Sequence, residues 1–213
     1  ARVLQEQGAA VALVRHRLAP GYRHPAGAED VAAAVAFLLA RAERFGFDPA
    51  RVTLGGYASG AHLAALVALD PAYLAAQGAD AARLAGVLGL SGVYDLDPDP
   101  APSPEELAFY EQAFGDASVR RAASPQRLAV QAGAPVLLIA SEQDIPGYVQ
   151  GAVRFADALR AAGRQPAEAF LVMGRDHVSE LDFTDARNAA RIHVLSFLQL
   201  DERGEDIREL FAA

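Results

Sequence analysis

The stretch from Gly56 to Gly60 (Gly-Tyr-Ala-Ser-Gly) follows the apolar run 52–54 and constrains the fold more than any other part of the sequence. Two glycines four residues apart permit a sharp turn from a strand into a helix, because they let neighbouring backbone segments come close together. Residues 59–69 are rich in alanine, which suits a helix packed tightly on a sheet. We therefore expect a strand, a tight turn centred on Ala58 and a helix.

Short apolar runs alternate with helical stretches along the rest of the chain. The expected strands are residues 9–18, 51–54, 85–91, 135–140 and 167–173, and the expected helices are residues 28–45, 59–69, 105–114, 150–162 and 183–198. Such alternation builds a mostly parallel sheet with helices on both faces. The sequence therefore predicts a single α/β domain over residues 1–213.

One stretch, at about residues 96–122, differs in character from the rest. A proline-rich loop at 97–104 leads into a helix that carries Phe109, Tyr110 and Phe114. Long excursions between core elements are often lids over a binding pocket. We interpret this stretch as a lid or cap insertion, and an ordinary surface excursion is the alternative.

Composition excludes several classes of protein. A chain of 213 residues with 52% hydrophobic residues can bury one sizeable core, and its net charge of −8 argues against a nucleic-acid partner. No apolar run approaches the roughly 20 residues that a membrane-spanning helix needs. The absence of cysteine removes disulfides and thiolate chemistry but does not identify a compartment. The chain opens at Ala1 with neither an initiator methionine nor a signal peptide, so we expect that an upstream segment is missing.

Three residues follow the expected strands in an informative order: Ala58, Asp144 and His177. In a parallel sheet, functional residues gather beyond the carboxyl ends of the strands. This is the chain order of a catalytic triad, with a nucleophile first, an acid second and a histidine third. In such a triad the imidazole transfers a proton, and the carboxylate holds the imidazole in the right orientation. Glu142 competes with Asp144 for the acidic role, and we favour Asp144 because Pro146 turns the loop directly after it.

The remaining histidines and acids are better explained as structural. We expect His62 to pack beneath the turn at Ala58, Asp176 to be a solvated neighbour of His177, and Asp95 to cap a loop. No pair or triplet of these side chains has convincing metal-ligand spacing, so we predict no metal.

With these residues in place, the chain resembles the esterase and lipase branch of the α/β-hydrolases, in particular carboxylesterases similar to feruloyl esterases and kynurenine formamidase. The matching stretches are Arg17-Leu18-Ala19-Pro20 with Pro25 and Asp30, residues 47–52, residues 55–64, residues 90–96, Ala123-Ser124-Pro125, and Gly174-Arg175-Asp176-His177. The resemblance implies hydrolysis of a small aryl or short-acyl ester without a cofactor. It also implies a backbone N–H oxyanion donor at Ser59.

We expect the substrate, a small-molecule ester, to lie against Tyr57, Tyr94 and Phe109. Hydrolysis of an arylformamide is the alternative within the same class, because the triad does not distinguish an ester from a small amide. A non-catalytic ligand-binding pseudoenzyme is the alternative from another class.

Two departures from the family pattern matter. Ala58 stands where the family has serine, so this chain should be catalytically dead. Ser59 should not replace the missing nucleophile, because its side chain points about 100° away around the helix axis. Because every other support survives, we interpret Ala58 as an introduced change rather than a natural loss. The family's His-Gly-Gly stretch is also absent, and with it a strand expected between residues 9–17 and 51–55. We therefore hypothesise that another piece of polypeptide completes the sheet.

Overall fold

The computed structural model describes residues 1–98, 101–129, 133–164 and 166–200. Its helices are α1 (Arg2–Glu6), α2 (Ala26–Leu39), α3 (Ala42–Phe45), α4 (Ser59–Leu69), α5 (Pro71–Ala76), α6 (Pro104–Phe114), α7 (Ala117–Ala122), α8 (Tyr148–Ala161) and α9 (Ala189–Phe197), with short 3₁₀ turns η1 (Pro49–Arg51), η2 (Ala81–Arg83), η3 (Pro125–Leu128) and η4 (Ser179–Leu181). Its strands are β1 (Thr53–Tyr57), β2 (Gly86–Leu90), β3 (Val136–Gln143) and β4 (Ala167–Asp176).

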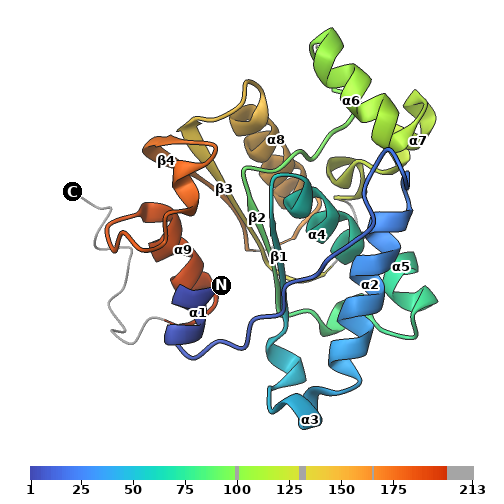
Figure 1. Cartoon of the computed structure of the whole chain (residues 1–213). Coiled ribbons are helices and arrows are strands. Elements are labelled where there is room, and N and C mark those ends of the chain that lie inside the picture. Colours follow the sequence, from blue (N-terminus) through green and yellow to red (C-terminus); the bar gives the residue numbers. More distant parts are fainter. Residues whose placement is uncertain (99–100, 130–132, 165, 201–213) are drawn as a thin grey trace.

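The four strands of the described residues form one parallel sheet in the order β1-β2-β3-β4. Helices α2, α4 and α5 lie on one side of the sheet, and α1 and α9 lie on the other (Figure 1). The prediction of a parallel sheet covered on both faces is therefore confirmed. No helix in the described ranges is both long and apolar enough to cross a bilayer.

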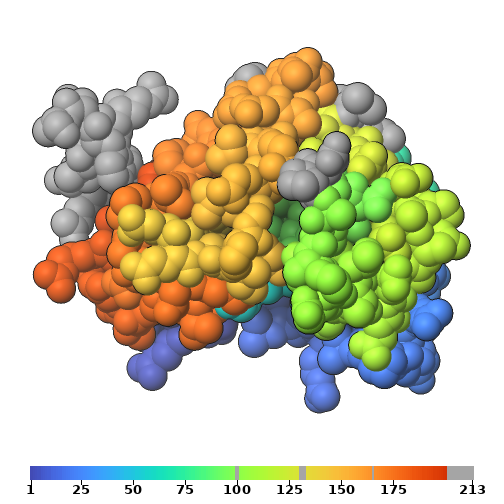
Figure 2. Space-filling view, turned by 90° about the horizontal axis from the view of Figure 1, so that it is seen from above, coloured from blue at the N-terminus to red at the C-terminus, as the bar shows by residue number. Residues whose placement is uncertain are grey.

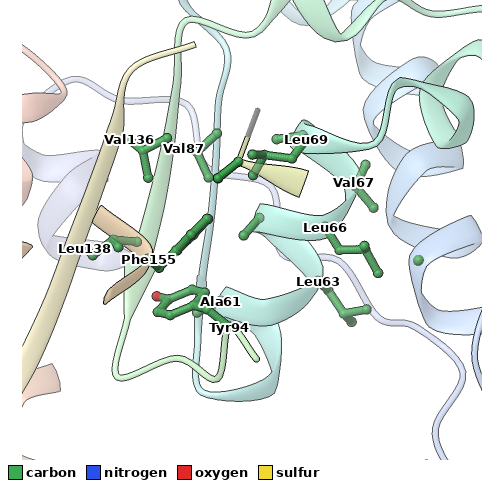
Figure 3. Packing of buried hydrophobic residues seen from close by; sticks show 14 of the residues in the cluster. Ala61, Leu63, Leu66, Val67, Leu69, Val87, Tyr94, Val136, Leu138 and Phe155 are labelled. Carbon is green, nitrogen blue, oxygen red and sulfur yellow. The ribbon is translucent and has the colours of Figure 1, made fainter. Parts of the chain in front are cut away.

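Alternating side chains of the inner strands feed two separate apolar clusters. Val136 and Leu138 of β3 point into the cluster formed with α2, α4 and α8, whereas Leu137 and Ile139 join the cluster beneath α9. Leu66 of α4 is fully buried in the first cluster (Figure 3). Each such aliphatic side chain contributes about 1.5–3 kcal/mol when it is fully buried. This packing fixes α4 against the sheet and so fixes the turn that precedes it.

Polar caps define where several of these helices begin. Ser103 accepts a hydrogen bond from the Glu106 N–H at the start of α6, and Pro104 takes the first helical position, where its missing N–H costs nothing. Asp70 caps α5 in the same way, with Pro71 after it. These local signals explain why the sequence located α6 closely, whereas α5 was not among the expected helices.

The prediction of a strand at residues 9–18 is wrong. The segment is extended but pairs with no strand among the described residues, and Leu13 is 82% exposed. An apolar run becomes a strand only where a neighbour accepts and donates its backbone hydrogen bonds. The segment is not paired with β1, so the hypothesis of an intervening strand is left standing.

Three other expectations needed correction. The helix expected over 28–45 is divided into α2 and α3 at Ala40 and Arg41, and nothing in these two residues explains the break. The last helix begins at Ala189 rather than near 183, because the buried side chain of Asn188 caps it while donating to the carbonyls of Glu180 and Asp182. Strands β1, β3 and β4 each end three residues later than expected.

An open edge on β1 predicts a pattern of amide hydrogen exchange. The Ala58 N–H donates to the Leu90 carbonyl, so the N–H of Tyr57 and that of Gly55 point away from β2. In monomeric protein, we expect these two amide protons to exchange much faster than those of Gly56 and Ala58, measured residue by residue by NMR. Equal protection on both sides of β1 would contradict an open edge.

Candidate active site

The turn between β1 and α4 is strained at its central residue. Ala58 has φ 51° and ψ −117°, a backbone conformation that non-glycine residues adopt at a cost of about 1–3 kcal/mol. Its N–H is held by the Leu90 carbonyl of β2, and its own carbonyl accepts from Ala61 and His62 in α4. Hydrogen bonds on both sides thus hold position 58 at the carboxyl edge of the sheet.

The turn is tight because Gly56 lies almost against Gly60. A Cβ atom added to Gly56 would lie 2.1 Å from the carbonyl carbon and oxygen of Gly60, whereas one added to Gly60 would meet no atom within 4 Å. The requirement for glycine at position 56 is therefore steric, and it comes from the approach of β1 to the first turn of α4.

Ser59 is the first residue of α4. The first N–H groups of a helix have no intrahelical acceptor, and they carry the positive end of the helix dipole. The Ser59 N–H therefore lies at the site as a donor suited to a developing oxyanion next to position 58.

Asp144 and His177 come together from the ends of β3 and β4. Asp144 Oδ1 lies 2.7 Å from His177 Nδ1; the Asp144 side chain is fully buried, and that of His177 is 22% exposed. The Ile145 N–H also donates to Asp144 Oδ1 at 2.8 Å. A buried carboxylate on Nδ1 leaves Nε2 of the ring as the nitrogen free to exchange a proton.

The neighbouring acids hold the loop that carries His177. Glu142 Oε2 accepts from the Gly174 N–H at 2.8 Å, so it supports the end of β4 and does not contact the imidazole. Asp176 accepts from the N–H groups of Val178 and Ser179, and these bonds lower the pKa of its carboxyl. Asp176 is thus a turn-forming residue beside His177.

Tyrosines enclose the imidazole on two sides. The Tyr57 hydroxyl donates to the His177 carbonyl at 2.7 Å, and the two rings lie 4.8 Å apart between centroids. Tyr148, at the start of α8, meets His177 edge-on at 5.6 Å, and burial raises the pKa of its hydroxyl to about 12. Tyr57 thereby ties the turn at position 58 to the His177 loop.

The other two residues expected to contact substrate lie in contrasting places. Tyr94 is 1% exposed and stacks on Phe155 of α8, so its ring belongs to the apolar core. Phe109 lies on α6 and is 64% exposed. Seen from the carboxyl edge, the green atoms of α6 and the yellow and orange atoms following β3 face each other across a furrow (Figure 2).

Helix α6 falls within the expected lid at 96–122, of which residues 99–100 lie outside the described residues. Its last residue, Phe114, contacts the rings of His24 and His62 at 5.3 and 5.2 Å. His62 is buried, its Nδ1 lies 3.1 Å from the Val93 carbonyl, and burial lowers its pKa to about 4. The carboxyl end of α6 is thus anchored on the core, while Phe109 faces solvent.

Four residues near the triad positions escaped sequence reasoning: Ser91, Ser141, Tyr148 and Glu180. Ser91 Oγ donates to Asp144 Oδ2 at 2.5 Å, and Ser141 Oγ donates to Glu180 Oε2 at 2.6 Å. Ser91 directly follows β2, and Ser141 lies near the end of β3. Because functional residues gather at the carboxyl ends of parallel strands, this position could have identified both serines from the sequence. No local sequence signal pointed to Glu180, because its partners are distant in the chain.

Asp95 pairs with Arg127 and accepts from the Asp97 N–H, so it organises a loop. In the part of the chain that the structure describes, no group of three or more His, Asp or Glu side chains is arranged to hold a metal ion.

The parallel sheet, the strained strand-to-helix turn and the histidine–aspartate pair at the same edge define an α/β-hydrolase. The chain belongs to the BD-FAE family, whose model matches residues 1–159. Relatives named as esterases share both sequence and fold with it.

The chain is 28% identical to Esterase LipC of Mycobacterium tuberculosis over 205 residues, which cover 91% of this chain and 50% of LipC. It therefore spans half the length of that relative. Among solved structures, an esterase of Pyrobaculum calidifontis matches with a TM-score of 0.76 at 22% identity, covering 93% of this chain and 69% of the other. The propionate-bound esterase Est2 of Thermogutta terrifontis matches with a TM-score of 0.65 at 20% identity, covering 90% and 67%.

The contact between Gly56 and Gly60 yields a matched pair of substitutions. Gly56→Ala should lower the free energy of unfolding by about 2–3 kcal/mol, because its Cβ would force α4 away from β1. Gly60→Ala, four residues away on the same turn, should change it by less than about 0.5 kcal/mol. Urea denaturation of the two variants and the parent measures both values, and equal effects would contradict the steric explanation.

Proposed function

We propose that this chain is the core of a serine carboxylesterase that acts on small aryl or short-acyl esters, and that Ala58 occupies the position of its nucleophile. The proposal rests above all on the Asp144–His177 pair, 2.7 Å apart and linked through Tyr57 to the strained residue 58. A hydroxyl at that position would meet a base already oriented by a buried carboxylate.

The proposed mechanism follows from the groups at the site. A serine hydroxyl at position 58 attacks the ester carbonyl while His177 Nε2 takes its proton. The Ser59 N–H stabilises the oxyanion, and His177 returns the proton to the departing alcohol. Water then repeats the sequence on the acyl intermediate. With alanine at position 58 the first bond cannot form, so the chain as it stands should bind esters without cleaving them.

Short acyl groups are favoured by the tyrosine rings that flank the imidazole on two sides. Tyr57 and Tyr148 border the imidazole and α6 carries Phe109 on the opposite side, so we propose that α6 acts as a lid and that these rings contact the substrate. The propionate bound by Est2, which has the same fold, is consistent with a short acyl chain. The buried ring of Tyr94 supports the wall of the site rather than touching the ligand.

We also propose that a further strand lies on the open edge of β1 in the working enzyme. Residues 53–57 have a partner on one side alone, and the extended segment preceding α2 has none in the described part of the chain. The unpaired backbone groups along the free edge of β1 favour the addition of one more strand. Such a strand could also carry the remaining oxyanion donors.

The central test is restoration of the hydroxyl by Ala58→Ser. We expect hydrolysis of p-nitrophenyl acetate at a rate on the order of 10³ times that of the parent chain or higher. His177→Ala or Asp144→Asn in the restored background should remove most of this gain. A feruloyl ester and N-formylkynurenine, assayed in parallel, distinguish an aryl esterase from a formamidase.

If the restored protein hydrolyses no acyl ester, the esterase proposal is wrong. Ester binding by the parent chain, measured by calorimetry, together with an inactive Ala58→Ser variant, would instead favour a non-catalytic binder.

A further inference from the structure

A second carboxyl group lies buried behind Asp144. Glu180, in the short turn η4, has no exposed surface, and its Oε2 accepts from the Ser141 hydroxyl at 2.6 Å. Its other oxygen, Oε1, has no hydrogen-bond partner among the described residues. Glu180 also forms no ion pair with a Lys, Arg or His side chain of those residues, since the nearby His177 pairs with Asp144. A carboxylate left in this state would be costly, because burial of a charge requires a compensating partner.

Ser141 and Ser91 connect this carboxyl group to Asp144. The Ser141 hydroxyl binds Glu180 while its backbone N–H donates to Asp144 Oδ2 at 3.3 Å. The Ser91 hydroxyl donates to the same Asp144 oxygen at 2.5 Å and also interacts with Glu180. Each serine thus links the two acids, so a movement of Glu180 would be transmitted to Asp144.

The groups that face Glu180 are the carboxylate of Asp144, the imidazole of His177 and the phenols of Tyr57 and Tyr94. Burial, with a smaller contribution from Asp144, raises the pKa of Glu180 to about 7, against the opposing effects of both serine hydroxyls and His177. Two carboxylates cannot both be ionised cheaply in one dry site, and the raised pKa of Glu180 favours its neutral form.

The backbone of Glu180 is also fixed in place. The buried side chain of Asn188 donates to the Glu180 carbonyl at 2.8 Å and caps α9 with its oxygen. Helix α9 therefore holds the turn that presents the Glu180 carboxyl group to Ser141.

We propose that Glu180 is a positioning residue for the Asp144–His177 pair: as a neutral acid it fixes Ser141, and through it Asp144, without adding a second negative charge behind the imidazole. Ionisation of Glu180 would bring that charge and would favour the imidazolium form of His177 over the neutral base. The positioning follows from the network itself, and its consequence for catalysis rests on the proposed esterase function.

The first test needs no activity and uses the chain with Ala58 in place. In an NMR titration, the assigned His177 ring resonances of the parent should report a step near pH 7 that comes from Glu180, and this step should be lost in Glu180→Gln. Glu142→Gln is the control, because Glu142 follows Ser141 on β3 but accepts from the Gly174 N–H instead of contacting Asp144 or His177. Identical titration curves for parent and Glu180→Gln would overturn the proposal.

The second test uses the Ala58→Ser background. Glutamine mimics the neutral acid, so Glu180→Gln should keep kcat within about threefold at pH 6, whereas Glu180→Ala should lower kcat by about tenfold with little change in KM. Equal losses of kcat in both variants would contradict the role of Glu180 as a neutral acid. An unchanged kcat in both variants would show that Glu180 contributes to packing and does not position Asp144. If Ala58→Ser is inactive, the esterase proposal fails, and the NMR titration still decides the role of Glu180.

Discussion

The close approach of β1 to the first turn of α4 is the constraint on which the rest of the site depends. No side chain fits between Gly56 and Gly60, so the chain must turn within three residues, and that turn forces residue 58 into a strained conformation. The strain persists because α4 is buried continuously from Ala61 to Leu69, with Leu66 and its neighbours packed in the core. Core packing thereby stabilises the position at which chemistry would occur.

Side chains from three separate segments converge at the same edge of the sheet. Asp144, His177, Ser91 and Glu180 are up to 89 positions apart in the chain, since 180 − 91 = 89, yet hydrogen bonds link them in one network. Parallel strands make this possible, because all their carboxyl ends lie on one side. The two acids in the network have different environments. Asp144 accepts hydrogen bonds from several donors, whereas burial is the largest influence on the pKa of Glu180.

Much of the architecture was predictable from local patterns. Alternating apolar and helical stretches gave the parallel sheet, and the order of Ala58, Asp144 and His177 along the chain indicated which strand ends to compare. The segment at 9–18 was wrongly predicted because an apolar run looks the same with or without a neighbouring strand. The position of Pro146 favoured Asp144 over Glu142, and the hydrogen bond of Asp144 to the imidazole of His177, which Glu142 does not make, separates the two acids in the structure.

The sequence by itself determined the turn at residues 56–60, the helices with strong caps and the residue types available at each strand end, because these depend on neighbours a few positions away. The tertiary structure alone decided that Tyr94 lies in the core, that Tyr57 binds the His177 loop and that Glu180 lies behind Asp144. Those contacts join residues tens of positions apart, and burial and charge at such contacts exist only after the sheet has brought the segments together.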